Sequence, residues 1–144
     1  MRERLKKFAA EFGLPDMQVR ERSPNTRRAL AIAELARDEG KLPLFRDLAM
    51  DAHWRRGLDL ERDEDLRAIA QDAGLDPERS IAASTDPAYL ARIDARREEA
   101  EERGVTGIPT FVLGNQALVG CQPYEVLAAF VEDSGARRKA LEPR

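Results

Sequence analysis

The single cysteine of this sequence, Cys121, is a candidate for redox or nucleophilic chemistry. It precedes Gln122-Pro123, a pattern typical of a helix start, where the helix dipole can favour the thiolate form. A reactive thiol also needs exposure and a base or a resolving cysteine, and no such partner is visible in the sequence. The alternative is that Cys121 is a small residue joining a strand to a helix. One cysteine cannot form an intramolecular disulfide or a redox pair.

The segment Gly107-Ile108-Pro109-Thr110 is the second candidate site. Pro109 stands where an X-Pro bond would open a strand, and the residues after it favour β structure. Because only about 5–6% of X-Pro bonds are cis, composition alone predicts a trans bond here. The residue types by themselves indicate a strand start and no particular chemistry.

The only histidine, His53, lies at the margin of an apolar helical stripe, beside Trp54. Catalysis or metal binding would need partner residues, and Gly57, one helical turn later, offers none. We therefore interpret His53 as a packing or surface residue.

The acidic residues from Asp59 to Asp65 alternate with other residues, as the ligands of a calcium loop do. However, Glu64 occupies the sixth loop position, where glycine is needed, and Ala70 the twelfth, where a bidentate Glu belongs. We interpret the segment as a loop followed by a helix cap, and we expect no metal and no cofactor.

Composition narrows the function classes. Charged residues make up 35% of the 144 residues, and the net charge is −3. Phosphate binding needs a clustered basic face, so this mild acidity argues against nucleic-acid binding. No apolar run resembles a signal peptide or a membrane span, so we expect no membrane association and a cytoplasmic location.

Most of the chain is predicted to be helical. Asp76-Pro77 and Asp86-Pro87 repeat one start signal, an acidic cap followed by proline at the first helical position. Asn25 and Asp63 are predicted N-caps, and residues 14–19 are a candidate short strand. The predicted helices cover about 2–12, 26–39, 43–57, 63–74, 77–83, 87–104 and a last stretch from Gln122-Pro123.

Helical spacing predicts which side chains face inward. In chain order these are Leu5, Phe8, Ala9 and Phe12; Ala29, Leu30, Ala33 and Ala36; Leu44, Phe45, Leu48, Ala49 and Ala52; Leu66, Ile69, Ala70 and Ala73; Tyr89, Leu90, Ile93 and Ala100; and Val126, Leu127, Phe130 and Val131.

Residues 110–113 and 116–119 are predicted to form a hairpin around Gly114-Asn115, a pair suited to a type II′ turn. Apolar residues do not alternate along these strands, since Phe111 and Val112 are neighbours. Such a hairpin needs cover on both faces. Because two strands alone are marginal in water, we expect further sheet or close helix packing.

The sequence resembles the DsbA-like branch of the thioredoxin superfamily over residues 2–131, particularly its FrnE-type subgroup. Relatives of this branch include the 2-hydroxychromene-2-carboxylate isomerases and the kappa-class glutathione transferases. The most specific motif is Gly-Val-Thr-Gly-Ile-Pro-Thr-Phe at 104–111, counted from Gly104. The matching segments are 24–30, 35–40, 66–76, 104–111 and 120–127.

The resemblance implies a mostly helical α/β protein with a truncated thioredoxin-like fold. It implies a DsbA-like domain over 1–133, with a helical insertion at 26–104 and the loop, hairpin and final helix at 105–133. Residues 134–144 are expected to be a disordered tail. In the family the proline matching Pro109 is cis, and the loop from Gly107 to Thr110 faces the catalytic dithiol and presents the backbone beside Ile108 to a substrate chain.

The sequence departs from the family at its catalytic motif. Family members begin with a β–α–β segment whose helix starts at Cys-x-x-Cys, and such a unit takes about 30 or more residues. No Cys-x-x-Cys or Ser-x-x-Cys occurs in these 144 residues, and Cys121 stands where family members often have a small residue such as alanine. We therefore expect the dithiol segment to be missing.

Three hypotheses follow. The first is a DsbA-like protein without independent thiol–disulfide activity, which self-associates as a homodimer through its incomplete sheet. The second is an active oxidoreductase or glutathione-linked isomerase that uses Cys121 or residues supplied in trans. The third is a non-catalytic module that binds a peptide or protein substrate near Ile108-Pro109.

Overall fold

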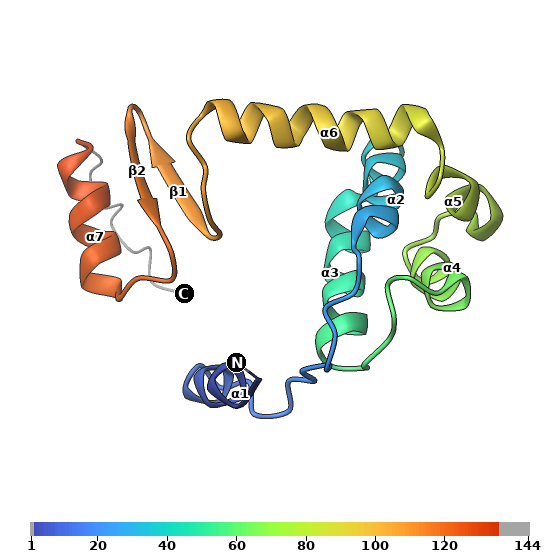
Figure 1. Ribbon diagram of the computed structural model, residues 1–144, viewed down its shortest axis with the longest axis horizontal. Helices are drawn as coiled ribbons and strands as arrows, with labels where there is room; N and C mark the ends of the chain where they lie inside the picture. Colours follow the sequence, from blue (N-terminus) through green and yellow to red (C-terminus); the bar gives the residue numbers. More distant parts are fainter. Residues whose placement is uncertain (1, 136–144) are drawn as a thin grey trace, which may run out of the picture. The chain divides into compact units, whose positions relative to one another are not determined.

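The computed structural model describes residues 2–135 and shows a largely helical chain with one small sheet (Figure 1). The predicted class, mostly helical α/β, is confirmed. The predicted tail lies outside the described residues from residue 136 onward. The elements are α1 (Arg2–Glu11), α2 (Arg27–Asp38), α3 (Leu42–Trp54), α4 (Asp63–Asp72), α5 (Pro77–Ala83), α6 (Pro87–Glu102), β1 (Thr110–Leu113), β2 (Gln116–Val119) and α7 (Tyr124–Asp133).

The chain divides into two compact units, Met1–Arg96 and Arg97–Arg144. The boundary falls within α6, so this helix begins in the first unit and ends in the second. The assignment of 1–133 to one domain stays a prediction.

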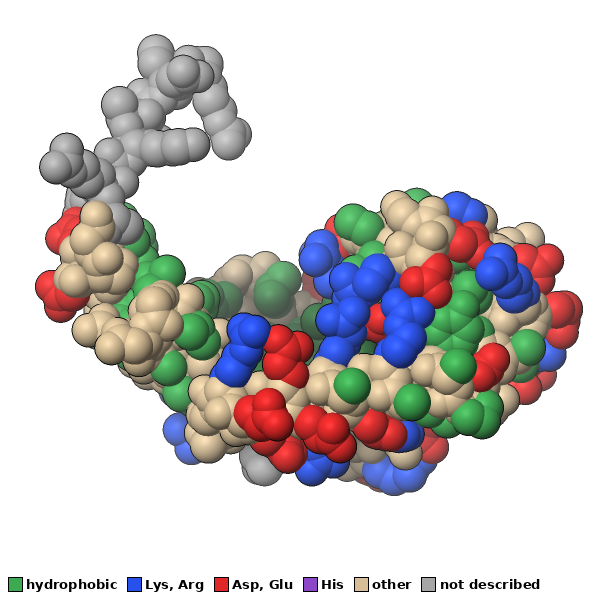
Figure 2. Space-filling view, turned by 90° about the horizontal axis from the view of Figure 1, so that it is seen from above, with side chains coloured by type: hydrophobic (Ala, Val, Ile, Leu, Met, Phe, Trp, Pro, Cys, Tyr) green, Lys and Arg blue, Asp and Glu red, His purple; other side chains and the backbone are tan. Residues whose placement is uncertain are grey.

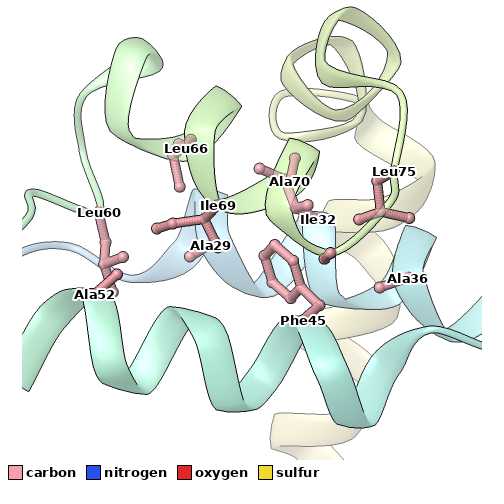
Figure 3. Close-up of a cluster of buried hydrophobic side chains, with 11 residues drawn as sticks. Ala29, Ile32, Ala36, Phe45, Ala52, Leu60, Leu66, Ile69, Ala70 and Leu75 are labelled. Atoms are coloured by element: carbon pink, nitrogen blue, oxygen red, sulfur yellow. The ribbon is translucent and has the colours of Figure 1, made fainter.

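The helices α2 to α5, which we call the helical block, enclose a core of buried apolar side chains (Figure 3). Ile32 of α2, Phe45 of α3 and Ile69 of α4 are at most 2% exposed. Each of these helices contributes one apolar face, and burial of apolar area is the main stabilising term, about 25 cal/mol per Å². The core cluster consists of Ala29, Ile32, Ala36, Phe45, Ala52, Leu60, Leu66, Ile69, Ala70, Ala73 and Leu75.

The start of α5 and the end of α4 follow the predicted signals. The Asp76 carboxylate accepts a hydrogen bond from the Arg79 backbone N–H at 2.7 Å and caps α5. Gly74 follows the C-cap Ala73 with φ +72°, a conformation that glycine adopts at little cost. The inward face predicted for α4 is confirmed, since Leu66, Ile69, Ala70 and Ala73 are all buried.

The inward face predicted for α2 is wrong at one residue. Leu30 is 47% exposed, whereas Ile32 is fully buried. Two residues along a helix are roughly 200° apart, so a core that contacts Ile32 leaves Leu30 on the opposite side. Leu44 of α3 is exposed in the same way, beside the buried Phe45.

The N-terminal segment differs most from its prediction. Residues 14–19 form no strand. Of the apolar residues predicted to face inward on α1, only Ala9 is buried, and Leu5, Phe8 and Phe12 are exposed. The amphipathic pattern produced a helix, but its larger apolar side chains stay exposed in residues 2–135.

Several predicted caps and helix starts shift along the chain. Asp63 is the first residue of α4, whose N-cap is Arg62, and the last helix begins at Tyr124 after Pro123. The N-cap of α2 is Thr26, although the Asn25 side chain still accepts a hydrogen bond from the Arg27 N–H at 3.0 Å. The Asn25 side chain therefore still accepts a hydrogen bond from the first turn of α2, although Asn25 lies one residue before the N-cap.

The predicted hairpin is confirmed, with β1 and β2 antiparallel, Thr110 opposite Val119 and Leu113 opposite Gln116. Gly114 has φ +60° and Asn115 has no positive φ, which is the sign pattern of a type II′ turn. No described residue from 97 to 135 is buried, including the predicted inward side chains of α7. No described helix is long and apolar enough to cross a membrane.

Candidate functional site

The loop Gly107-Ile108-Pro109-Thr110 leads from α6 into β1 and is the most exposed apolar feature of the described chain. The Ile108 side chain is 91% exposed, and Pro109 is exposed beside it. The Ile108–Pro109 peptide bond is cis. The Thr110 hydroxyl donates a hydrogen bond to the Gly107 carbonyl oxygen at 2.5 Å, which closes the loop on itself. Ile108 is thereby presented outward from a closed loop.

The end of β2 holds this loop in place. The Gly120 N–H donates to the Pro109 carbonyl oxygen at 2.8 Å. Gly120 has φ +92°, a backbone conformation that side chains disfavour. A Cβ atom on Gly107 would lie 3.1 Å from a methyl carbon of Val119, tighter than ordinary packing. Glycine is therefore favoured at both positions, for two different reasons.

Cys121 lies at the same end of the hairpin as the loop, because it directly follows Gly120. It is exposed and is a free thiol. The adjacent Gln122 side chain donates a hydrogen bond to the Val119 carbonyl oxygen at 2.8 Å. Since α7 begins at Tyr124, Gln122 and Pro123 separate Cys121 from the helix. The catalytic role of Cys121 stays a prediction, and the structure gives it no described acid–base partner.

The hairpin offers apolar side chains and open backbone beside the loop. Phe111 and Val112 of β1 and Val119 of β2 are at least 40% exposed. The described sheet has only two strands, so the outer edge of each strand has no neighbour in residues 2–135. Such a site can receive an extended chain through backbone hydrogen bonds and apolar contacts.

His53 takes the packing role expected for it. Its ring lies edge-on to Trp54, with the ring centroids 4.5 Å apart. Burial lowers the pKa of His53, and the charge of Arg20 lowers it further, which favours the neutral ring. Its Nδ1 atom is buried without a hydrogen-bond partner among the described residues.

The acidic residues of 59–65 bind arginine side chains and backbone N–H groups. Asp59 pairs with Arg20 at 3.3 Å, and Asp65 accepts a hydrogen bond from the Asp59 N–H at 2.8 Å. Glu61 pairs with Arg22 at 2.7 Å. In the part of the chain that the structure describes, no group of three His, Cys, Asp or Glu side chains could hold a metal ion.

Sequence reasoning missed two contacts near the loop: Gly120, whose N–H bonds to Pro109, and Gln122, whose side chain bonds to Val119 at the end of β2. The position of Gly120 directly after β2 could have indicated a backbone with positive φ, because such a conformation favours glycine. The hydrogen bond from Gln122 had no sequence signal of its own.

Known proteins resemble most of this chain. A family model described as a DSBA-like thioredoxin domain matches residues 1–132. The 2-hydroxychromene-2-carboxylate isomerase of Sphingobium xenophagum is 28% identical over 98 residues, which are 68% of this chain and 50% of that protein. The crystal structure of a probable DsbA oxidoreductase from Streptomyces coelicolor matches with a TM-score of 0.75 and 30% identity, covering 99% of this chain and 62% of that one. The chain thus spans half the length of the curated relative.

Proposed function

The chain belongs to the family of DSBA-like thioredoxin domains, and from this premise we propose that its 144 residues bind an extended polypeptide substrate at the Ile108-Pro109 loop without carrying out thiol–disulfide exchange alone. The observation that carries the proposal is a closed, outward-facing loop in a sequence that contains one cysteine. A dithiol exchange reaction needs two thiols, and a second one must come from elsewhere. The FrnE-type subgroup and the cytoplasmic location are part of this proposal and rest on the sequence alone.

The loop has the features that binding of an extended chain requires. Ile108 offers an apolar contact, and the hydrogen bonds of Thr110 and Gly120 fix the backbone around it before a substrate arrives. A loop that is already ordered loses less conformational entropy on binding. The open strand edges of the hairpin add backbone donors and acceptors to the same surface.

Peptide binding is tested with the full chain and reduced, carboxymethylated insulin B chain as the probe. We expect Ile108→Asp to weaken binding roughly tenfold or more, because it replaces an apolar contact with a charge. The matched control is Leu30→Asp, which places the same charge on an exposed apolar residue of the helical block. No measurable binding by the unaltered chain, or equal loss in both variants, would contradict the proposal.

Turnover is tested by reduction of insulin disulfides with dithiothreitol. The unaltered chain and Cys121→Ala are both expected to match the background rate. A rate above background that disappears in Cys121→Ala would instead support an active oxidoreductase that uses Cys121. This alternative, or a glutathione-linked isomerase with residues supplied in trans, is motivated by the exposed thiol beside the loop and by the isomerase relative.

We propose further that the hairpin is completed by self-association of the chain as a homodimer. From Gly104 to Tyr124 no residue is charged, although charges make up 35% of the sequence. Natural edge strands usually carry charged or otherwise protective residues, because an uncharged edge pairs readily with another strand. This hairpin has the composition of interior strands, and a second copy offers the same open edges.

Sedimentation velocity tests this association. The unaltered chain is expected to sediment as a dimer, and Val112→Lys is expected to shift it to monomer by placing a charge on the hairpin. Leu30→Lys, at a similarly exposed apolar residue outside the hairpin, is expected to stay dimeric. A well-folded monomer from the unaltered chain would contradict self-association and leave the peptide-binding test unaffected.

A further inference from the structure

Glu34 of α2 is the only charged residue that is buried among the described residues, with 4% of its surface exposed. Its carboxylate accepts hydrogen bonds from Arg96 of α6 at 2.8 and 3.2 Å and pairs with Arg92 of α6 at 2.8 Å. Arg37, one turn along α2, lies 3.4 Å away. A carboxylate on one helix thus contacts two arginines of another that lie far along the sequence.

Two further ion pairs join the same two helices. The Arg92 guanidinium donates two hydrogen bonds to Asp38, at 2.7 and 2.9 Å. Arg27 of α2 donates two to Asp94 of α6, at 2.6 and 2.7 Å. Such bidentate arginine–carboxylate pairs are among the stronger polar contacts in proteins. We call Glu34, Asp38, Arg92 and Arg96 the Glu34 cluster.

Apolar packing contributes little to the attachment of α6. No residue of α6 is buried, and its predicted inward residues, such as Leu90 and Ile93, are only half-buried. Figure 2 views the molecule from the side of α6 and shows acidic and basic side chains gathered over this helix. The helix α4, by contrast, buries Leu66 and Ile69 completely.

We propose that the Glu34 cluster is the main attachment of α6 to α2, and that its disruption releases α6 while the helical block stays folded. The last arginine of the cluster, Arg96, is also the last residue of the first unit. Beyond it α6 continues into the unit that carries the Ile108-Pro109 loop.

The burial of the Glu34 charge explains why the attachment of α6 to α2 depends on the arginines that pair with Glu34. Burial of Glu34 raises its pKa, but the hydrogen bond from Arg96 and the charges of Arg96, Arg37 and Arg92 lower it by more, so the net direction is down. A buried carboxylate without its arginines would be strongly destabilised where it lies. Once α6 separates, water can solvate Glu34, which makes separation the favourable response to loss of the arginines.

Hydrogen exchange of the full chain, followed by mass spectrometry, tests the proposal. In Glu34→Gln we expect the amides of residues 90–96 to exchange roughly ten- to hundredfold faster, because a hydrogen-bonded ion pair is lost. The double variant Arg92→Gln/Arg96→Gln breaks the pairs from the α6 side, where both arginines are partly exposed. Glu99→Gln, which removes a carboxylate paired within α6 to Arg103, is the matched control.

Protection of α3 and α4 separates release from general destabilisation. Faster exchange in α6 with α3 and α4 unchanged, in both cluster variants and not in Glu99→Gln, supports the proposal. Equal acceleration in all helices would show that the cluster only contributes to overall stability, and unchanged exchange in α6 would show that other contacts hold the helix. Either result would overturn the inference.

Discussion

In the helical block, Ile32, Phe45 and Leu66 are at most 2% exposed, whereas the described residues from 97 to 135, which we call the hairpin unit, bury no side chain. The difference does not come from a lack of apolar residues, because β1 and β2 contain Phe, Val and Leu. The difference comes from the number of helices and strands that pack against one another in each unit. Four helices enclose a core between them, while one hairpin and one helix leave their apolar faces open.

This comparison relates stability to function. The helical block can fold around its own core, whereas the hairpin unit has apolar surface that only a further contact can bury. The Ile108-Pro109 loop and the free thiol of Cys121 both lie in the unit without a core. Four experiments test this difference in stability between the helical block and the hairpin unit.

The largest expected effect is the truncation of a core aromatic side chain. Phe45→Ala should lower the free energy of unfolding by about 3–5 kcal/mol, since it leaves a cavity in the block. Phe111→Ala in β1 should cost about 1 kcal/mol or less, because the Phe111 side chain is already 40% exposed. Urea unfolding followed by circular dichroism measures both. Equal costs would mean that the hairpin unit has a core of its own.

Acid should destabilise the helical block next most strongly. The hydrogen bond from Arg92 lowers the pKa of Asp38, and the Asn25 N–H and Arg22 lower that of Glu61. The pKa of Glu34 is also lowered. Carboxyl groups with a folded-state pKa below the ordinary value stabilise the protein above that value. This stabilisation is lost as the pH falls through the folded-state pKa values.

We therefore expect the urea midpoint to fall as the pH is lowered below about 4, the ordinary range for these carboxyl groups. The decline should be less steep in Glu34→Gln, which lacks one of the titrating groups. A midpoint that does not change between pH 6 and pH 3 would contradict the contribution of these ion pairs.

The loss of one helix cap should have a smaller effect. Asp76→Ala removes the acceptor of the Arg79 N–H at the start of α5 and should cost about 1 kcal/mol. Asp76→Asn keeps an acceptor oxygen and should cost much less. The N-cap of α7, Pro123, has no such side-chain bond, so the hairpin unit has no corresponding cap to lose there. Thermal or urea unfolding of the two variants measures the difference.

The smallest effect is expected at an exposed ion pair. Glu101→Gln removes the partner of Arg97, at 2.8 Å on the surface of α6, and should change the free energy of unfolding by less than about 0.5 kcal/mol. A cost comparable to that of Asp76→Ala would show that charged surface contacts stabilise the hairpin unit more than its exposure suggests.

Much of the local structure was predictable because its causes are local. The Asp-Pro pair predicted the start of α5, Gly74 the end of α4, and Gly114-Asn115 the turn between β1 and β2. The family segments predicted the loop that now carries the proposed function. The strand expected at 14–19 was wrong because a strand needs a neighbouring strand, and no described strand lies beside this segment, whose Gln18 N–H bonds to the Trp54 carbonyl oxygen of α3 instead.

The sequence by itself determined where the helices and the hairpin form and that these residues contain one thiol. Only the tertiary structure decided that Ile32 faces the core while Leu30 does not, and that Glu34 is buried. Helical periodicity predicts a set of side chains that could face the core. The position of the neighbouring helices decides which of these side chains are buried. A charged residue such as Glu34 can be buried only because Arg92 and Arg96, distant in the sequence, fold back to pair with it.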